Sequence, residues 1–182
     1  MSRRVALISA AAGYVGPDLA KLLATRGHDL VLGDAPDDVI ADLRETGADV
    51  VNVTGVGNLA APSSSQRLLD AALDRFGRVD SATAFTGRII VGRFLKSTLD
   101  DMRAVNEGCI EAPYNFLRAL VPQMIEQEGG GQVLVLTSAA GARPTPGAPL
   151  YSSARAGANM LVRNVAAEVA DRNVQVNAIG TN

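Results

Sequence analysis

The sequence predicts one doubly wound α/β domain built on a parallel sheet. Short aliphatic or β-branched runs alternate along the 182 residues with longer stretches of helical periodicity, separated by glycine, proline, aspartate or serine. The apolar runs are continuous, as expected of strands that are covered on both faces. Hydrophobic residues make up 47% of the chain, which is enough for one buried core.

Six strands and five helices are expected in alternating order. The strands are placed at residues 5–9, 30–32, 50–53, 79–84, 133–137 and 174–178. The helices are placed at residues 17–26, 37–46, 63–76, 98–127 and 150–171. Glycines stand where helix C-caps belong, at positions 27, 47, 77 and 129. N-terminal caps are expected from Ser63 and from Thr98 or Asp100. Right-handed crossovers then give the Rossmann-like strand order 3-2-1-4-5-6, with the site at the carboxyl ends of the strands.

No repeat or linker marks a second domain, so residues 1–182 are expected to form one domain. The chain stops directly after the sixth expected strand, at Gly180-Thr181-Asn182. A seventh strand and a loop over the site are missing on this interpretation, and we expect a domain that is truncated at its C-terminus.

Composition and charge exclude several classes of function. The net charge is -2, basic residues are not clustered, and only 4% of residues are aromatic, so nucleic acid is not an expected partner. No run approaches the ~18 apolar residues of a membrane span, and the first apolar run is too short for a signal peptide. We therefore expect a soluble, cytoplasmic protein without a membrane partner. Cys109 and His28 are each the only residue of their type, which argues against a disulfide and against a metal site.

Two glycine-bearing turns are candidates for binding a phosphate. The first follows the first strand and reads Ser9-Ala10-Ala11-Ala12-Gly13-Tyr14-Val15-Gly16. Glycine lets backbone N–H groups approach a pyrophosphate, and here alanine and tyrosine replace two of the expected glycines. We expect the Tyr14 ring to project into the space of a dinucleotide. The second turn, Gly55-Val56-Gly57-Asn58-Leu59-Ala60, precedes Pro62 and three serines, so its helix begins too late to face a phosphate.

An acidic residue at the end of the second strand gives the best single argument for a dinucleotide. Asp34 stands where an acid binds an adenosine ribose. A role as a turn or capping residue within Gly33-Asp34-Ala35-Pro36-Asp37 explains it equally well. If a dinucleotide is bound, the residues expected to contact it are Gly13, Gly16, Asp34 and Gly87.

Residues that carry acid–base chemistry follow the fifth strand. Ser138 is separated from Tyr151 by twelve residues, and Tyr151 from Arg155 by three. Positions i and i+4 share one helix face, so the Arg155 guanidinium can lie beside the phenol oxygen and stabilise the phenolate. Tyr151 is then a usable general base, while Ser138 holds the substrate oxygen. The spacing of the Tyr–Arg pair alone would equally fit a surface helix contact, and Ser138 together with the alternating strands and helices favours a site.

Over essentially its whole length the chain resembles the short-chain dehydrogenases. Arg155 replaces the lysine of their Ser/Tyr/Lys site, and Asn106 falls where they place an asparagine of the proton relay. The chain also resembles the halohydrin dehalogenases, whose patterns are Ser-x12-Tyr-x3-Arg and Thr-x4-Phe/Tyr-x-Gly. The second pattern is matched with serine in place of threonine, at Ser9, Tyr14 and Gly16.

This resemblance implies a halohydrin dehalogenase that uses no cofactor. Ser138 binds the hydroxyl of a vicinal halo-alcohol, Tyr151 takes the proton, and the alkoxide displaces the halide to form an epoxide; the reverse reaction opens epoxides with small anions. The implied halide or nucleophile pocket consists of Ser9, Tyr14, Gly16 and Asn182. The implied partners are a halo-alcohol or epoxide and a halide or other small anion. No metal is expected.

Two alternatives stay open. In an NAD- or NADP-dependent oxidoreductase, Tyr151 would exchange a proton with a carbonyl while nicotinamide exchanges hydride. A non-catalytic binding protein of the same fold is the other. In the resembling families two helices build a dimer interface, so a homo-oligomer, a dimer of dimers, is expected. Small residues on the helices 98–127 and 150–171 are expected to face outward at Ala112, Ala119, Ala156, Ala158, Ala166 and Ala167.

Overall fold

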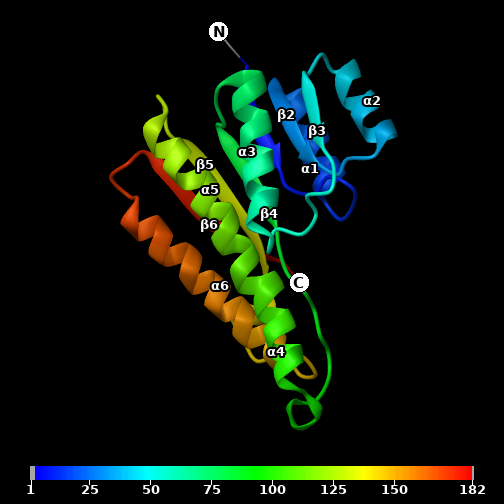
Figure 1. The fold of residues 1–182 in the computed structure, drawn as a ribbon, viewed down its shortest axis with the longest axis vertical. Coiled ribbons are helices and arrows are strands. Elements are labelled where there is room, and N and C mark those ends of the chain that lie inside the picture. Colours follow the sequence, from blue (N-terminus) through cyan, green and yellow to red (C-terminus); the bar gives the residue numbers. More distant parts are fainter. Residues whose placement is uncertain (1–2, 182) are drawn as a thin grey trace.

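The computed structural model describes residues 3–181 and contains a six-stranded parallel sheet with helices on both faces (Figure 1). The strands are β1 (Arg4–Ile8), β2 (His28–Gly33), β3 (Val50–Val53), β4 (Ser81–Phe85), β5 (Gly131–Ser138) and β6 (Val174–Thr181). The helices are α1 (Gly16–Thr25), α2 (Asp37–Glu45), α3 (Pro62–Phe76), α4 (Leu99–Asn106), α5 (Ala112–Glu126) and α6 (Pro149–Glu168). Short helical turns, η1 (Phe94–Lys96), η2 (Glu107–Glu111) and η3 (Ala139–Gly141), complete the set. The strand order is β3-β2-β1-β4-β5-β6, so the predicted fold class and order are confirmed.

The sheet separates two apolar cores because successive strand residues point to opposite faces. In β1, Val5 and Leu7 pack into the core beneath α3, α5 and α6, whereas Ala6 and Ile8 pack into the core beneath α1 and α2. Figure 1 shows α3, α5 and α6 lying together across one face of the sheet. This burial on both faces explains why the strand sequences are continuously apolar.

The ends of several elements differ from the sequence-based expectation. The fourth strand begins at Ser81 and not at Val79, because the backbone N–H and C=O of Val79 bond to the Gln127 side chain. Ser63 lies inside α3, whose N-cap is Ala61. Thr98 does cap α4, in a capping box with Asp101. The four glycines expected at helix C-caps all have positive φ angles, between 72° and 90°. Gly77 is the C-cap of α3, and Gly27 and Gly47 directly follow the C-caps of α1 and α2, whereas Gly129 lies two residues beyond the C-cap of α5.

The single helix expected across residues 98–127 is interrupted by a π-helical turn, η2. Pro113 has no N–H to donate to the carbonyl four residues earlier, so regular α-helical bonding cannot continue there. Gly108 lies in this turn, and a Cβ on it would approach the Arg88 Cβ to 2.6 Å. The turn therefore lets the connection between β4 and α4 pass close to the helix.

The surfaces of α5 and α6 differ in part from the prediction. Ala112 and Ala158 are buried in the fold and do not face outward. Ala156 and Ala167 are exposed as expected, and larger apolar side chains, including Tyr114 and Met160, are exposed on the same two helices. Among residues 3–181 no helix is both long and apolar enough to span a membrane.

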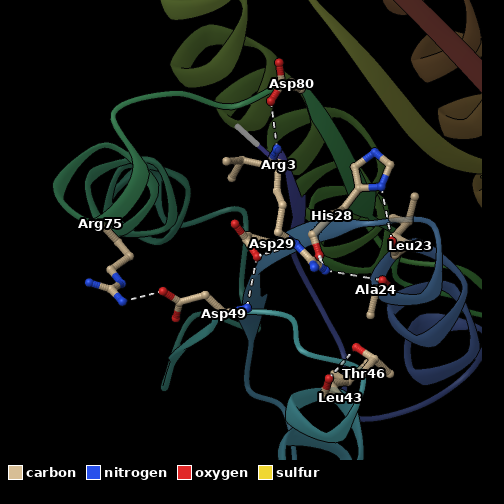
Figure 2. A network of polar contacts seen from close by, with 11 residues as sticks. Arg3, Leu23, Ala24, His28, Asp29, Leu43, Thr46, Asp49, Arg75 and Asp80 are labelled. Carbon is tan, nitrogen blue, oxygen red and sulfur yellow. Dashed lines mark hydrogen bonds and ion pairs between the residues drawn. The ribbon is translucent and has the colours of Figure 1, made fainter. Parts of the chain in front are cut away.

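Charged residues form a network at the edge of the sheet where the strands begin (Figure 2). Arg3 bonds to Asp29 at 2.9 Å, and Arg75 forms an ion pair with Asp49. The buried carboxylate of Asp80 accepts the backbone N–H of Val5 at 2.7 Å. These contacts join the starts of β1, β2 and β3 to the helices around them.

Candidate functional site

A cavity of about 420 Å³ opens at the carboxyl ends of β4, β5 and β6, beside the start of α6. Its polar walls include Ser138, Tyr151 and Arg155, the three residues that the sequence analysis selected as catalytic. Its apolar walls include Tyr14, Phe85, Ile89 and Leu136. The structure thus brings the proposed acid–base group together in one cavity at the predicted edge of the sheet.

Tyr151 and Arg155 form a buried pair on the first turns of α6. The Arg155 Nε donates a hydrogen bond of 3.0 Å to the Tyr151 Oη. The guanidinium carbon lies 5.2 Å from the centre of the tyrosine ring. The i and i+4 spacing therefore places the cation beside the phenol oxygen as expected, where it favours a negative charge on that oxygen.

The other guanidinium nitrogens of Arg155 are held by neutral oxygens. Nη1 donates to the Thr86 Oγ1 at 3.0 Å and to the Leu136 carbonyl at 3.3 Å, and Nη2 donates to the Thr86 carbonyl. Arg155 is only 4% exposed, and within residues 3–181 no carboxylate forms an ion pair with it. The positive charge is thus buried without a counter-ion from the described part of the chain, an arrangement that hydrogen bonds must offset.

Ser138 ends β5 and lines the same cavity. Its Oγ accepts the backbone N–H of Ala140 at 3.2 Å and donates to the Thr181 carbonyl at 3.4 Å. The bond to Thr181 is long and therefore weak, so it is readily exchanged for a bond to a substrate oxygen.

The turn between β1 and α1 contributes one side chain to the cavity. Tyr14 has a φ of 54° and is 66% exposed, and its ring packs edge-on against Phe85 with centroids 6.4 Å apart. Ser9 is buried, and its Oγ accepts the Phe85 N–H at 2.9 Å, so it joins β1 to β4. Gly16 is packed against the Ala10 backbone, where a Cβ would collide with a carbonyl oxygen.

Of the predicted halide pocket, therefore, Tyr14 lines the cavity, whereas Ser9 and Gly16 support the turn behind it. The fourth predicted member, Asn182, lies outside the described residues. Asn106, the predicted relay residue, ends α4 and does not line this cavity.

The residues proposed for a dinucleotide lie in three different settings. Gly13 is open, since nothing lies within 4 Å of a Cβ built on it. Asp34 has a φ of 52°, and its carboxylate accepts the backbone N–H groups of Gly55 and Val56. Gly87, with a φ of 127°, follows β4, and a Cβ on it would collide with the Arg155 guanidinium.

The second glycine-bearing turn serves the fold. Its Gly55 and Val56 N–H groups bond to Asp34, and the helix behind it begins at Pro62. The helix thus begins well after the turn, as the sequence analysis expected.

The sequence analysis missed Thr86. This residue follows β4, lines the cavity and contacts Arg155 through both its side chain and its main chain. Thr86 directly precedes Gly87, and this position was the only hint in the sequence that it lies near the site. Its hydroxyl contacts a residue 69 positions away, so spacing along the chain does not predict the contact.

Comparisons with known proteins point to one family. The family described as short chain dehydrogenase matches residues 4–182. A 3-oxoacyl-[acyl-carrier-protein] reductase of Synechocystis is 29% identical over 98% of this chain and 73% of its own length. An uncharacterised NAD-dependent oxidoreductase of Mycobacterium tuberculosis is 30% identical over 97% of this chain and 70% of its own length. The solved structure of a 7 alpha-hydroxysteroid dehydrogenase with NADH matches with a TM-score of 0.87 and 25% identity, over 97% of this chain and 69% of that one.

These relatives correct two expectations. A protein without a cofactor is contradicted, because one relative is named as NAD-dependent and the hydroxysteroid dehydrogenase is complexed with NADH. The prediction relied on the Tyr14 ring as an obstacle, yet that ring is mostly exposed at the mouth of the cavity. The narrower resemblance to halohydrin dehalogenases is likewise not supported by these relatives, which are named as oxidoreductases.

Proposed function

The chain belongs to the short chain dehydrogenase family, and on that premise we propose that it is an NAD(P)-dependent oxidoreductase acting on a small, uncharged alcohol or carbonyl compound. The observation that carries the proposal is the bond of 3.0 Å from Arg155 Nε to Tyr151 Oη, in a cavity that Ser138 also lines. This arrangement provides a proton donor and acceptor, a group that stabilises its charged form, and a hydroxyl that orients the substrate.

In the direction of reduction, the Ser138 hydroxyl donates a hydrogen bond to the substrate carbonyl oxygen. The Tyr151 hydroxyl gives its proton to that oxygen as the alcohol forms, and the Arg155 guanidinium stabilises the phenolate that remains. In the direction of oxidation, the phenolate takes the proton back from the alcohol. A bound nicotinamide would supply or accept the hydride.

The turn after β1 leaves room for a dinucleotide at Gly13, where nothing lies within 4 Å of a Cβ built on it. In the first turn of α1, the Gly16 N–H bonds to the Gly13 carbonyl and Pro17 has no N–H, so the helix itself presents few free N–H groups to a pyrophosphate. The Tyr14 ring lines the cavity, and about 420 Å³ of space remains beside it. The guanidinium nitrogens of Arg155 already bond to Tyr151, Thr86 and Leu136, so they are not free to bind a nicotinamide ribose.

The walls of the cavity favour an uncharged substrate. Phe85, Ile89 and Leu136 are apolar, and Arg155 is the one charged residue among the described lining residues. Because its guanidinium is committed to protein oxygens, it offers no strong bidentate contact to a substrate carboxylate or phosphate. A small aliphatic or aromatic alcohol or ketone matches these walls best.

The experiment combines dinucleotide binding with turnover. We expect calorimetry to show binding of NADH or NADPH, and a panel of secondary alcohols and ketones to change the nicotinamide absorbance in the presence of the protein. The Tyr151→Phe variant is the matched control, since it should still bind dinucleotide but not turn over. Absence of binding for both dinucleotides would overturn the proposal.

A second candidate function is ring closure of a vicinal halo-alcohol, and the replacement of lysine by Arg155 favours it. Here Tyr151 takes the hydroxyl proton, and the alkoxide forms a C–O bond as the neighbouring carbon–halogen bond breaks. Release of chloride or bromide, measured with and without dinucleotide, distinguishes this reaction from alcohol oxidation.

We also propose that two copies associate through α5 and α6. These helices carry the exposed Tyr114 and Met160 side chains, and an apolar groove lies between them that includes Leu117 and Leu161. Light scattering should report a dimer or tetramer, and a Tyr114→Glu variant should shift the protein toward the monomer. A monodisperse wild-type monomer at micromolar concentration would contradict this association.

A further inference from the structure

We propose that Thr86 is a positioning residue for proton transfer: it holds the Arg155 guanidinium, which in turn holds the Tyr151 hydroxyl. The proposal rests on the proposed function only in that Tyr151 is taken as the residue that moves the proton. It applies equally to a carbonyl and to a halo-alcohol substrate.

Thr86 contacts the guanidinium with two of its oxygens. Its Oγ1 accepts from Arg155 Nη1 at 3.0 Å, and its carbonyl accepts from Nη2. The same hydroxyl donates its proton to the Leu136 carbonyl at 2.9 Å. A hydroxyl has one proton and two lone pairs, so this donation fixes the rotor and leaves a lone pair for Nη1. The Thr86 hydroxyl is thus held in the orientation in which it accepts a hydrogen bond from Arg155.

The Leu136 carbonyl closes the set of contacts. It accepts from Thr86 Oγ1 at 2.9 Å and from Arg155 Nη1 at 3.3 Å. Without the Thr86 hydroxyl, Nη1 would keep only this longer bond among those that the structure shows. The end of β4 and the end of β5 therefore position the cation jointly.

Thr86, Gly87 and the Leu136 carbonyl together form what we call the guanidinium seat. Gly87 lies on the side of the seat that faces Arg155 Nη2. A Cβ at Gly87 would collide with Arg155 Nη2, and its φ of 127° is itself unfavourable for other residues. The seat accepts a planar fork with several donors, whereas a lysine ammonium would present a single point charge. We infer that Thr86 matters for an arginine at position 155 and not for a lysine.

No carboxylate among the described residues forms an ion pair with Arg155. An ion pair would fix the guanidinium by charge, but here only hydrogen bonds to neutral oxygens orient it. Loss of one of them should let the guanidinium move relative to the Tyr151 Oη. The effect should therefore appear at Tyr151, which Thr86 is not seen to contact.

The first test uses carbon-13 at the Cζ atom of tyrosine and needs no substrate. The chain has three tyrosines, so Tyr151→Phe assigns the Tyr151 resonance by its disappearance. We expect Thr86→Val to move this resonance in the same direction as Arg155→Met does, and Thr86→Ser, which keeps the hydroxyl, to leave it near its wild-type position. Thr83→Val removes a buried threonine hydroxyl from β4, the strand that Thr86 directly follows, and is the matched control. The Tyr114 resonance should not move in any of these variants. A Tyr151 resonance that is unchanged in Thr86→Val would overturn the proposal.

The second test is a double-mutant cycle on turnover. Thr86→Val should lower kcat by about 10-fold, as expected for loss of one hydrogen bond to a charged group. In the Arg155→Lys background the same substitution should change kcat by less than about 2-fold, because the guanidinium N–H that donates to Thr86 is already gone. Equal losses in both backgrounds would show that Thr86 acts independently of Arg155. If the protein oxidises no alcohol, the proposed function fails, while the resonance of Tyr151 still decides the role of Thr86.

Discussion

Buried charges have different surroundings at the two ends of the sheet. Where the strands begin, charges are paired: the buried Asp80 bonds to Arg78 at 2.6 Å. Arg3 bonds to Asp29 at the same edge of the sheet (Figure 2). The side-chain hydrogen bond to Asp80 raises the pKa of Arg78 above its ordinary value. Where the strands end, Arg155 is equally buried, but its neighbours are neutral oxygens.

This difference separates a structural use of charge from a chemical one. A paired charge is neutralised locally and acts as a link between elements. An unpaired buried cation lowers the energy of any negative charge that develops next to it, and the nearest candidate is the Tyr151 oxygen. A buried charge without a counter-ion is therefore a better indicator of a functional site than the number of charges in a region.

The largest expected effect is at Tyr151. Tyr151→Phe keeps the ring that packs in the small core around Val105 and Cys109 but removes the hydroxyl. Turnover should fall by about 10²- to 10⁴-fold, the usual size of an acid–base contribution, with the melting temperature nearly unchanged. Steady-state kinetics and calorimetric unfolding check this. A variant with near-normal turnover would remove Tyr151 from the mechanism.

Arg155→Met tests the unpaired cation directly. Turnover should fall by about 100-fold, because the phenolate loses its stabilising charge. The free energy of unfolding should change by less than about 1 kcal/mol, since removing a buried charge without a counter-ion offsets the lost hydrogen bonds. Denaturant unfolding monitored by circular dichroism measures the second quantity. A loss of stability well beyond this value would place Arg155 with the structural charges.

Asp80→Ala is the corresponding change at the other end of the sheet. It leaves the buried N–H of Val5 without its acceptor and Arg78 without its partner. We expect a loss of about 2 kcal/mol in unfolding free energy, discounted because Arg78 is partly exposed. The kcat of the folded enzyme should be unchanged. A large fall in kcat at unchanged stability would show that the charge at Asp80 also acts in turnover, and would contradict its assignment as a structural charge.

The smallest expected effect concerns Asp101, a charge in the capping box at the start of α4. Its backbone and side-chain hydrogen bonds with Thr98 lower the pKa of the carboxyl below its ordinary value of 3.8. A lowered pKa means that the charged form stabilises the fold above that value and that this contribution disappears as the pH falls through the folded-state pKa. The stability difference between wild type and Asp101→Asn should therefore be present at neutral pH and shrink in acid. Denaturant midpoints measured across this range test the sign, and a difference that grows in acid would contradict it.

Much of the fold was predictable because its determinants are local. Continuous apolar runs indicated the strands, glycines indicated the ends of α1, α2 and α3, and crossover handedness then gave the strand order. The interruption at η2 was not predicted, although Pro113 is visible in the sequence. Whether a proline ends, bends or bulges a helix depends on what packs against it.

The Tyr–Arg pair could be predicted from residue spacing alone, because side chains four residues apart on a helix share one face wherever the helix lies. The rest of the site depends on how the elements pack together. Ser9 bonds to Phe85 across two strands, Asp34 bonds to a distant turn, and Thr86 reaches Arg155 on another element. These contacts depend on the register and spacing between elements, which packing sets and which no local pattern of residues encodes.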